Sequence, residues 1–254
     1  MLDVRFINIC GVPVSSVNIE QACHAIDEWI RARRKVYICV APVSTIVDSR
    51  SDAGYKKVLE GADMITPDGM PVVWTARLKG DKNIARTYGP DLMLTLCEKG
   101  VARGYKHFLY GGTESTCSLL QNVLKQKMPD INIAGQFSPP FREVHVQEDQ
   151  DVIDRINRSG ADILWVGLGS PKQDYWMKEH RERLDVPVII GVGAAFDFLS
   201  GVKRQAPKWM RESGLEWFFR LCCEPGRLWK RYLVGNTRFL YFLIKDMLLP
   251  GRMK

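Results

Sequence analysis

The sequence predicts a doubly wound α/β fold with a mainly parallel β-sheet, and two features of the chain support this. Short apolar runs rich in β-branched residues alternate with stretches that have helical periodicity. The runs are apolar at nearly every position, as in strands buried on both faces of a parallel sheet. They cover residues Val36–Ala41, His107–Tyr110, Ile131–Ala134, Ile163–Gly167 and Val188–Val192.

The helices between these runs start at residues with clear capping chemistry. Asn18 and Gln21 have the spacing of a capping box at the start of the first helix. Further starts are expected with N-caps at Asp52 and Thr113 and with first-turn prolines at Pro90 and Pro171. In an open α/β sheet of this kind, ligands bind at the carboxyl ends of the strands.

Composition indicates a globular protein in a reducing compartment. The chain has 254 residues, 46% of them hydrophobic and 26% charged, and it is long enough for one large domain with an appendage. Its seven cysteines form an odd set without a C-x-x-C pair, which favours free thiols in the cytoplasm. The first residues lack the features of a secretory signal, and no apolar run is long enough to cross a bilayer.

The positive charge of the chain is concentrated in its last fifth. Residues 202–254 carry 12 Lys and Arg against four Asp and Glu, whereas residues 1–201 have a balance of −1. We therefore expect a catalytic body at 1–201 and a basic, aromatic-rich appendage at 202–254. Such asymmetry indicates an anionic partner for the appendage: membrane lipid, nucleic acid or a phosphorylated substrate.

The appendage is expected to contain one amphipathic helix from Pro225 to Met247–Leu249, ended by Pro250. A helical projection groups its basic residues on one stripe and its apolar residues opposite, with Arg227, Arg231, Arg238 and Lys245 against Trp229, Tyr232, Leu233, Leu240, Leu243 and Met247. Two interpretations stay open. The helix either lies in the interface of a membrane or docks its apolar face on the body.

Three loops after strand ends have polar content that suits catalysis or ligand binding. In the loop Thr66–Pro71, a proline and a glycine fix the backbone around the carboxylate of Asp68. This carboxylate could act as a general base, or the loop could be a plain turn. The loop Gly167–Gln173 could hold a phosphate on glycine amides, a helix start and Lys172, or be a tight βα turn. In the third, Gly191–Asp197, Asp197 could bind a ribose or cap a helix.

Other chemistries have weaker support. The four histidines stand apart in sequence, and Asp149-Gln150-Asp151 begins a polar surface helix, so no metal site is expected. A nicotinamide-dependent oxidoreductase would need a third glycine and an acidic residue about 20 positions later. A non-catalytic membrane or nucleic-acid binding module would explain only the appendage. Segregation of its aromatics from its arginines suits lipid better than nucleic acid.

Taken together, the motifs resemble the WecG/TagA/CpsF family of bacterial glycosyltransferases. The matching blocks follow in the family's order along nearly the whole chain, and the ordered set is specific although each block alone is common. They are Thr66–Pro71 (TPDGMP), Arg86–Met93 (RTYGPDLM), Gly167–Trp176 (GLGSPKQDYW), Gly191–Asp197 (GVGAAFD), Ala206–Trp209 (APKW), Gly214–Trp217 (GLEW), Arg220–Leu221 (RL) and Glu224–Arg227 (EPGR).

The resemblance implies a Rossmann-like body and an inverting, metal-independent enzyme that needs no cofactor. It also implies a UDP-sugar donor, an acceptor on undecaprenyl diphosphate, a place on the inner face of the bacterial membrane, and possible homo-oligomers. By analogy, Asp68 is the base and the appendage arginines Arg220 and Arg227 act on the leaving diphosphate. Substrate-binding positions carried over are Thr66, Gly69, Arg86, Gly167, Gly169, Lys172, Gln173, Gly193, Asp197 and Arg204.

Two departures from the family pattern put the sugar identity in doubt. Many members have Asn in the loop after the second strand, where this chain has Pro42, with Ser44 or Thr45 as possible substitutes. Many also have Arg directly before Ala-Pro, where this chain has Gln205 and places Arg204 one step earlier.

Overall fold

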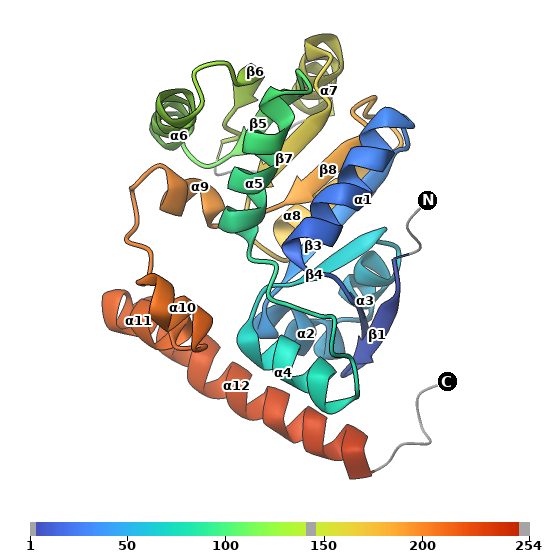
Figure 1. Cartoon of the computed structure of the whole chain (residues 1–254), viewed down its shortest axis with the longest axis vertical. Coiled ribbons are helices and arrows are strands. Elements are labelled where there is room, and N and C mark those ends of the chain that lie inside the picture. Colours follow the sequence, from blue (N-terminus) through green and yellow to red (C-terminus); the bar gives the residue numbers. More distant parts are fainter. Residues whose placement is uncertain (1–3, 141–145, 249–254) are drawn as a thin grey trace.

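The computed structural model describes residues 4–140 and 146–248, and a six-stranded parallel sheet forms its centre (Figure 1). The strand order is β4-β3-β8-β7-β5-β6, and every neighbouring pair is parallel. The strands are β3 (Val36–Ala41), β4 (Met64–Pro67), β5 (Lys106–Gly111), β6 (Asn132–Phe137), β7 (Ile163–Gly167) and β8 (Val188–Gly191). The predicted Rossmann-like α/β fold is confirmed.

Helices cover both faces of the sheet, and each face has its own apolar core. One face is covered by α1 (Ile19–Arg31), α5 (Gly89–Val101), α6 (Glu114–Lys127) and α9 (Ala195–Leu199). The other is covered by α2 (Val43–Ser51), α3 (Ala53–Glu60), α7 (Val146–Ser159) and α8 (Lys172–His180), and α4 (Met70–Leu78) extends that core.

Successive side chains of a strand point to opposite faces of the sheet, so they pack alternately into the two cores. In β7, Ile163 and Trp165 pack into the core under α5 and α6, whereas Leu164 and Val166 pack into the core under α8. A strand with an apolar layer on both faces needs an apolar residue at every position. This explains why the strands appear as continuous apolar runs in the sequence.

Most of the predicted helix starts are confirmed. Asn18 and Gln21 form the reciprocal capping box of α1, and the side chains of Asp52 and Thr113 accept the capping hydrogen bonds of α3 and α6. Pro171 differs, because it is the N-cap residue of α8 and lies just before its first turn.

Some strand boundaries also differ from the prediction. The run Ile131–Ala134 becomes β6 at Asn132–Phe137, since Ile131 packs into a core before the strand begins. The sequence interpretation also missed a two-stranded antiparallel hairpin of β1 (Phe6–Ile9) and β2 (Val12–Ser15), which turns at Cys10 and Gly11 with positive φ at both.

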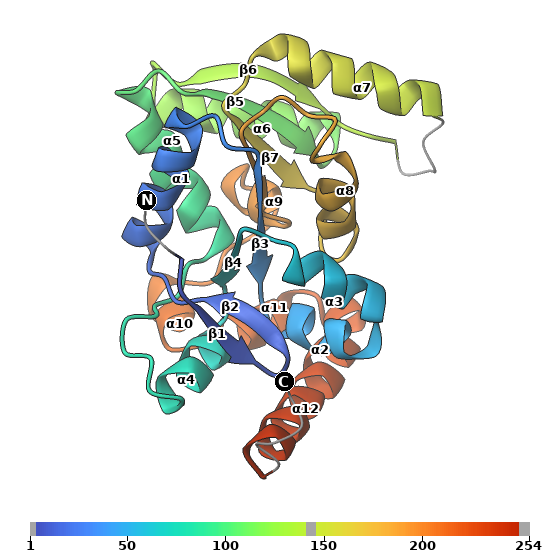
Figure 2. The ribbon, with the colours of Figure 1, turned by 90° about the vertical axis from the view of Figure 1, so that its right-hand side faces the viewer.

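The appendage forms three helices beside the body: α10 (Lys208–Glu212), α11 (Glu216–Cys223) and α12 (Pro225–Leu248). The long α12 runs below α2 and α4 in Figure 1, and Figure 2 shows it projecting downward from beneath α2. Phe239 of α12 is buried in the core that α2 and α3 share, and Asp246 pairs with Arg50 of α2 at 3.5 Å. The helix therefore docks on the body along one face, as the second interpretation of the appendage expects.

The opposite side of α12 nevertheless exposes a row of large apolar side chains. Exposed members are Trp229, Leu233, Val234, Leu240, Tyr241, Ile244, Met247 and Leu248. Tyr232 and Leu243, which the helical projection places on the same apolar side, are half-buried instead. Within the two described ranges, no helix combines the length and apolar character that crossing a membrane requires.

Candidate functional site

Two cavities lined by described residues open at the carboxyl edge of the parallel sheet, where the appendage meets the body. The larger has a volume of about 540 Å³ and the smaller about 120 Å³. The larger lies within the usual size range of small-molecule sites. Four residues line both: Pro42, Asp68, Arg220 and Arg231. The Asp68 carboxylate thus lies where the two cavities meet.

The position of Asp68 is fixed by the elements on either side of it. It directly follows β4, and its amide donates to the carbonyl of Ala41 at the end of β3 (3.3 Å). Gly69 is the N-cap of α4, whose first turn contains Pro71. The Asp68 side chain is 18% exposed, and its Oδ1 has no hydrogen-bond partner among the described residues.

The surroundings of Asp68 make its carboxylate more basic than usual. Burial is the largest effect and raises the pKa of Asp68 from 3.8 to about 7. Arg86 opposes this rise, and Glu216 adds to it. A group with a pKa close to the working pH is ionised in part of the molecules and still accepts a proton readily, which is the requirement for a general base.

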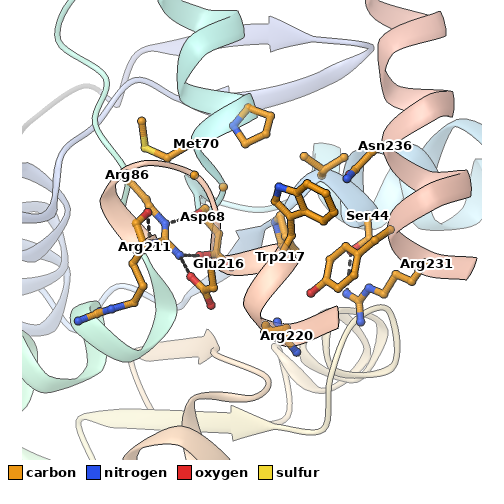
Figure 3. Close-up of a pocket in the computed structure, with 16 residues that line it drawn as sticks. Ser44, Asp68, Met70, Arg86, Arg211, Glu216, Trp217, Arg220, Arg231 and Asn236 are labelled. Carbon is orange, nitrogen blue, oxygen red and sulfur yellow. Dashed lines mark hydrogen bonds and ion pairs between the residues drawn. The ribbon is translucent and has the colours of Figure 1, made fainter. Parts of the chain in front are cut away.

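Arg86 connects Asp68 to the appendage (Figure 3). Its Nε donates to the backbone oxygen of Asp68 (2.5 Å), and its Nη1 donates to the backbone oxygen of Arg211 (3.1 Å). Its Nη2 forms an ion pair with Glu216 of α11 and lies 3.8 Å from Oδ1 of Asp68. The hydroxyl of Tyr88 donates to the other oxygen of Glu216 (2.8 Å).

Loops after β5, β7 and β8 form most of the larger cavity. Gly169 and Gly193 have φ of +79° and +53°, a region that glycine adopts without strain. Gln173 is buried in α8, and its Oε1 accepts from the amides of Gly169 (3.2 Å) and Gly193 (2.9 Å). The side chain of Gln173 therefore joins two glycine loops and sets the shape of the cavity wall.

Basic side chains from both parts of the chain surround the larger cavity. They are Lys172, Lys203, Arg220, Arg227 and Arg231. Asp197 also lines this cavity and pairs with Lys203 (2.7 Å), while Arg227 pairs with Glu224 (2.5 Å). Planar guanidinium groups and ammonium groups in such a number suit a ligand with several phosphate oxygens.

The smaller cavity is more apolar and lies between α2, α4, α11 and α12. Met70 and Trp217 contribute apolar surface, and Asn236 and Ser44 contribute polar groups. Ser44 accepts a hydrogen bond from Arg231 of α12 (2.7 Å). Of the two possible substitutes for the first-loop Asn, Ser44 therefore lies at the cavity, whereas Thr45 is buried and does not line it.

The structure brings most of the predicted site residues together. Gly69 and Arg86 line the smaller cavity, Asp68 and Arg220 line both, and the larger is lined by Gly167, Gly169, Lys172, Gln173, Gly193, Asp197 and Arg227. Two predicted residues line neither. Thr66 is fully buried in β4, the edge strand of the sheet, and Arg204 is exposed in the segment between α9 and α10.

Several residues that line these cavities were not assigned to the site from the sequence, and five of them bear on its chemistry. Gly112, Thr113 and Thr116 come from the loop after β5 and the start of α6, and Glu216 and Arg231 come from the appendage. The pair Gly111-Gly112 after a predicted strand was a usable signal, because it repeats the pattern of the other two glycine loops. Glu216 lies in the matching block Gly214–Trp217, but its contact with Arg86 could not be predicted because the two residues are 130 positions apart.

The Asp149-Gln150-Asp151 motif lies in α7, away from both cavities. Asp149 pairs with His180 (2.7 Å) and Arg183 (2.8 Å) of the α8 region. Among residues 4–140 and 146–248, no group of three His, Cys, Asp or Glu side chains is arranged to hold a metal ion.

Comparison with known proteins agrees with this geometry. The profile of the glycosyl transferase WecG/TagA/CpsF family matches residues 7–252. A protein of Bacillus spizizenii strain W23 is 30% identical over 210 residues, which cover 83% of this chain and 79% of that protein. A protein of Bacillus subtilis strain 168 is 34% identical over 182 residues, covering 72% and 69%. Both are named N-acetylglucosaminyldiphosphoundecaprenol N-acetyl-beta-D-mannosaminyltransferase.

The match favours the predicted glycosyltransferase over the oxidoreductase and the non-catalytic binding module. It extends from the first hairpin through the appendage, so it includes every loop that lines the two cavities. The chain therefore belongs to the WecG/TagA/CpsF family of glycosyltransferases.

Proposed function

We propose that this protein transfers an N-acetylmannosamine-type sugar from a UDP-sugar to a saccharide on polyprenyl diphosphate, with inversion at the anomeric carbon. The observation that carries the proposal is the position of Asp68, whose carboxylate lines two cavities of different chemistry. A transferase has to bring two substrates together at one base. A hydrolase or a simple binding protein has no such need.

The larger cavity is assigned to the nucleotide sugar. Its basic side chains and the glycine loops that Gln173 joins suit a diphosphate, and its volume of about 540 Å³ suits a ligand of this size. Asp197, on the same wall, is the candidate for the nucleoside hydroxyls. Thr113, the N-cap of α6, adds a hydroxyl at the helix start.

The smaller cavity is assigned to the acceptor. It combines apolar surface from Met70 and Trp217 with Arg231 and Asn236, as expected for a sugar diphosphate that continues into a lipid. Its walls come partly from α12, whose outer side exposes apolar residues. The acceptor's lipid would therefore lie on the side of the molecule where a membrane contact is proposed.

The reaction that follows from this arrangement is a single displacement. Asp68 accepts the proton of the acceptor hydroxyl as its oxygen forms a bond to the anomeric carbon. The bond between that carbon and the diphosphate oxygen breaks, and UDP leaves with the electron pair. One base is sufficient for such a step, and the relatives' names specify a β-linked product, which an α-linked nucleotide sugar gives by inversion.

We assign two arginines of the appendage the role of stabilising the negative charge on the leaving diphosphate. Arg220 lines both cavities and Arg227 lines the larger one, so both are within the region where the diphosphate would gain charge. Preorganised guanidinium groups stabilise such charge in a water-poor site. We accordingly propose a reaction that needs no metal ion.

A donor screen tests the proposal. Purified protein would receive a short-chain lipid-diphosphate-linked N-acetylglucosamine acceptor and a panel of UDP-sugars, with and without EDTA. We expect transfer from one UDP-sugar, retained with EDTA, and a loss of about 10² to 10⁴-fold in Asp68→Asn. Asp130→Asn, an exposed carboxylate in a distant loop, is the matched control and should transfer normally.

Full activity in Asp68→Asn would refute the role of the base, and loss of transfer with EDTA would refute metal independence. An α-linked product, identified by NMR, would refute inversion. If no UDP-sugar supports transfer while another nucleotide sugar does, the assigned donor is wrong.

A further inference from the structure

One short segment of the body holds the appendage over the base. Arg86 donates to the backbone of Arg211, the hydroxyl of Tyr88 donates to Glu216, and Asp91 pairs with Arg211 (3.0 Å). These contacts connect α10 and α11 to the stretch between α4 and the first turn of α5. The same stretch contains the cation closest to the Asp68 carboxylate.

Within this group, two carboxylates compete for one guanidinium. Nη2 of Arg86 forms its ion pair with Glu216, whereas Oδ1 of Asp68 lies 3.8 Å from the same nitrogen and has no hydrogen-bond partner among the described residues. Glu216 is only 12% exposed and receives a second hydrogen bond from Tyr88. The guanidinium also lies over the ring of Tyr88, 4.1 Å from its centroid, which restricts its movement.

We propose that Glu216 is a positioning residue that holds the Arg86 guanidinium on α11 and so leaves the Asp68 carboxylate free to accept a proton. This inference rests on the proposed function, in which Asp68 is the base. Because Glu216 belongs to the appendage and Asp68 to the body, the base would be available only when α11 is docked.

The charged and titratable groups that face Asp68 come from both parts of the chain. From the body these are Arg86, Tyr88 and Asp91, and from the appendage Arg211, Glu216, Arg220, Arg231 and Tyr232. Three appendage groups in this set are arginines, and Glu216 is the single carboxylate that the appendage contributes among the described residues. Without it, the positive charge around Asp68 would favour the ionised carboxylate and make it a weaker base.

If α11 leaves the body, Arg86 loses its stronger partner. The nearest remaining carboxylate is Asp68, and a rotation of the Arg86 side chain would be sufficient to close the gap of 3.8 Å. A paired Asp68 would accept protons poorly. This exchange of partners would keep the base inactive while the site is open to water and so protect the sugar donor from hydrolysis.

A direct titration of Asp68 tests whether Glu216 keeps Arg86 away from it, and this test needs no assay of sugar transfer. The side-chain carboxyl of Asp68 would be followed by ¹³C NMR in the full chain, with its resonance identified by its absence in Asp68→Asn. We expect Glu216→Gln to move the midpoint of this titration to lower pH by at least about one unit. Glu216→Asp keeps the charge and should move it less, and Arg86→Gln/Glu216→Gln should return it toward the wild-type value.

Glu212→Gln is the matched control, because it removes the same charge from an exposed position in the same appendage. An unchanged Asp68 titration in Glu216→Gln would overturn the inference, and so would an equal shift in Glu212→Gln. A variant that does not fold would lack the dispersed methyl spectrum of wild type. In that event Glu216→Asp decides, since a titration identical to that of Glu212→Gln would overturn the inference.

Kinetics then connect the titration to the reaction. In Glu216→Gln we expect a lower kcat, an unchanged KM for the donor, and an acidic limb of the pH profile displaced in the same direction as the NMR midpoint. If the wild type transfers no sugar but the NMR shift occurs, the proposed function fails, whereas the effect of Glu216 on the Asp68 titration stands. If transfer occurs with a normal pH profile in Glu216→Gln, the inference fails and the proposed function stands.

Discussion

Asp68 shows how much of a side chain's chemistry comes from residues far away in the sequence. Proline and glycine around it fix its backbone, and that much is visible in a six-residue motif. The raised pKa of Asp68 depends mainly on burial under the appendage and on Glu216, which lies 148 positions later. The motif thus predicts where the carboxylate points, and the tertiary structure determines how basic it is.

The burial of Asp68 predicts a pH-dependent cost in stability. Its pKa is about 7 in the folded protein and about 3.8 when exposed, so the folded state binds the extra proton between these values. Stability is therefore lost as pH rises from about 4 to 7. Asp68→Asn should raise the free energy of unfolding by up to a few kcal/mol above pH 7, since each pKa unit corresponds to about 1.4 kcal/mol.

Urea denaturation of wild type and Asp68→Asn at pH 4, 6 and 8 measures this. The difference between the two proteins should be near its minimum at pH 4 and grow toward pH 8. A constant difference, or one that shrinks with pH, would contradict a protonated Asp68 in the folded state. Asp130→Asn should show no such trend.

The position of a cavity residue is visible in the sequence where it depends on a local backbone shape. Asp68, Gly169 and Gly193 follow strands in short loops, and the periodicity of the strands locates those loops. Sequence reasoning failed for Glu216 and Arg231, which reach the cavities from helices in the appendage. Thr66 belongs to a recognisable motif, but its side chain is fully buried in β4 and lines neither cavity.

Among the helices, α8 holds two glycine loops together through the side chain of Gln173. The amides of Gly169 and Gly193 both donate to Oε1 of Gln173. Gln173→Leu keeps the size of the side chain and removes the acceptor, which should cost about 1–3 kcal/mol of stability. We also expect weaker binding of UDP, because the glycine loops would no longer hold one shape.

Calorimetric titration with UDP and urea denaturation measure these two effects. Gln126→Leu, on the exposed side of α6, is the control and should change neither. Wild-type UDP affinity in Gln173→Leu would show that the loops keep their shape without the Oε1 acceptor.

The helix α12 has two apolar faces, one docked on the body and the other exposed. One face contributes Phe239 to the core of the body, and the other leaves Leu240 and Ile244 57% and 56% exposed. Such exposure beside basic residues is typical of helices that lie on anionic membranes. Replacement of Leu233, Leu240 and Ile244 by Gln should abolish flotation with anionic vesicles and leave stability unchanged.

A matched triple variant on the body, with Phe6, Leu78 and Leu119 changed to Gln, controls for general loss of apolar surface. It should float like wild type. Flotation of the α12 variant with anionic vesicles would contradict a membrane contact through this helix.

The sequence located α12 almost to the residue, with an expected start at Pro225 and an end close to Leu248. The sequence could not decide between docking and membrane contact. One face of the helix docks on the body, and the other face is exposed and free to contact a membrane. Helical projection assumes a single apolar side. The projection groups Tyr232 and Leu243 with Leu240 and Met247, but in the structure the first two are half-buried and the other two are exposed.

For the molecule as a whole, the division into a body at 1–201 and an appendage at 202–254 is a proposal about how the parts separate. The core that holds α12 depends on Phe239 and on the ion pair between Arg50 and Asp246. Phe239→Ala should release α12 before the body unfolds, because removal of a buried Phe side chain costs about 3–5 kcal/mol.

Limited proteolysis with trypsin measures this separation. In Phe239→Ala we expect rapid cleavage between residues 202 and 231 and a persistent body fragment, with the wild type cleaved much more slowly. Phe218→Ala, an exposed position in α11, is the control. Cleavage throughout the chain at one rate would show that body and appendage unfold as one unit.

The position of Asp68 where two cavities meet has a further consequence under the proposed function. The proposed nucleotide would enter and leave by the cavity of the glycine loops, and the proposed lipid-linked acceptor by the cavity beside α12. The two products would then leave by separate routes. Neither product has to wait for the other to leave.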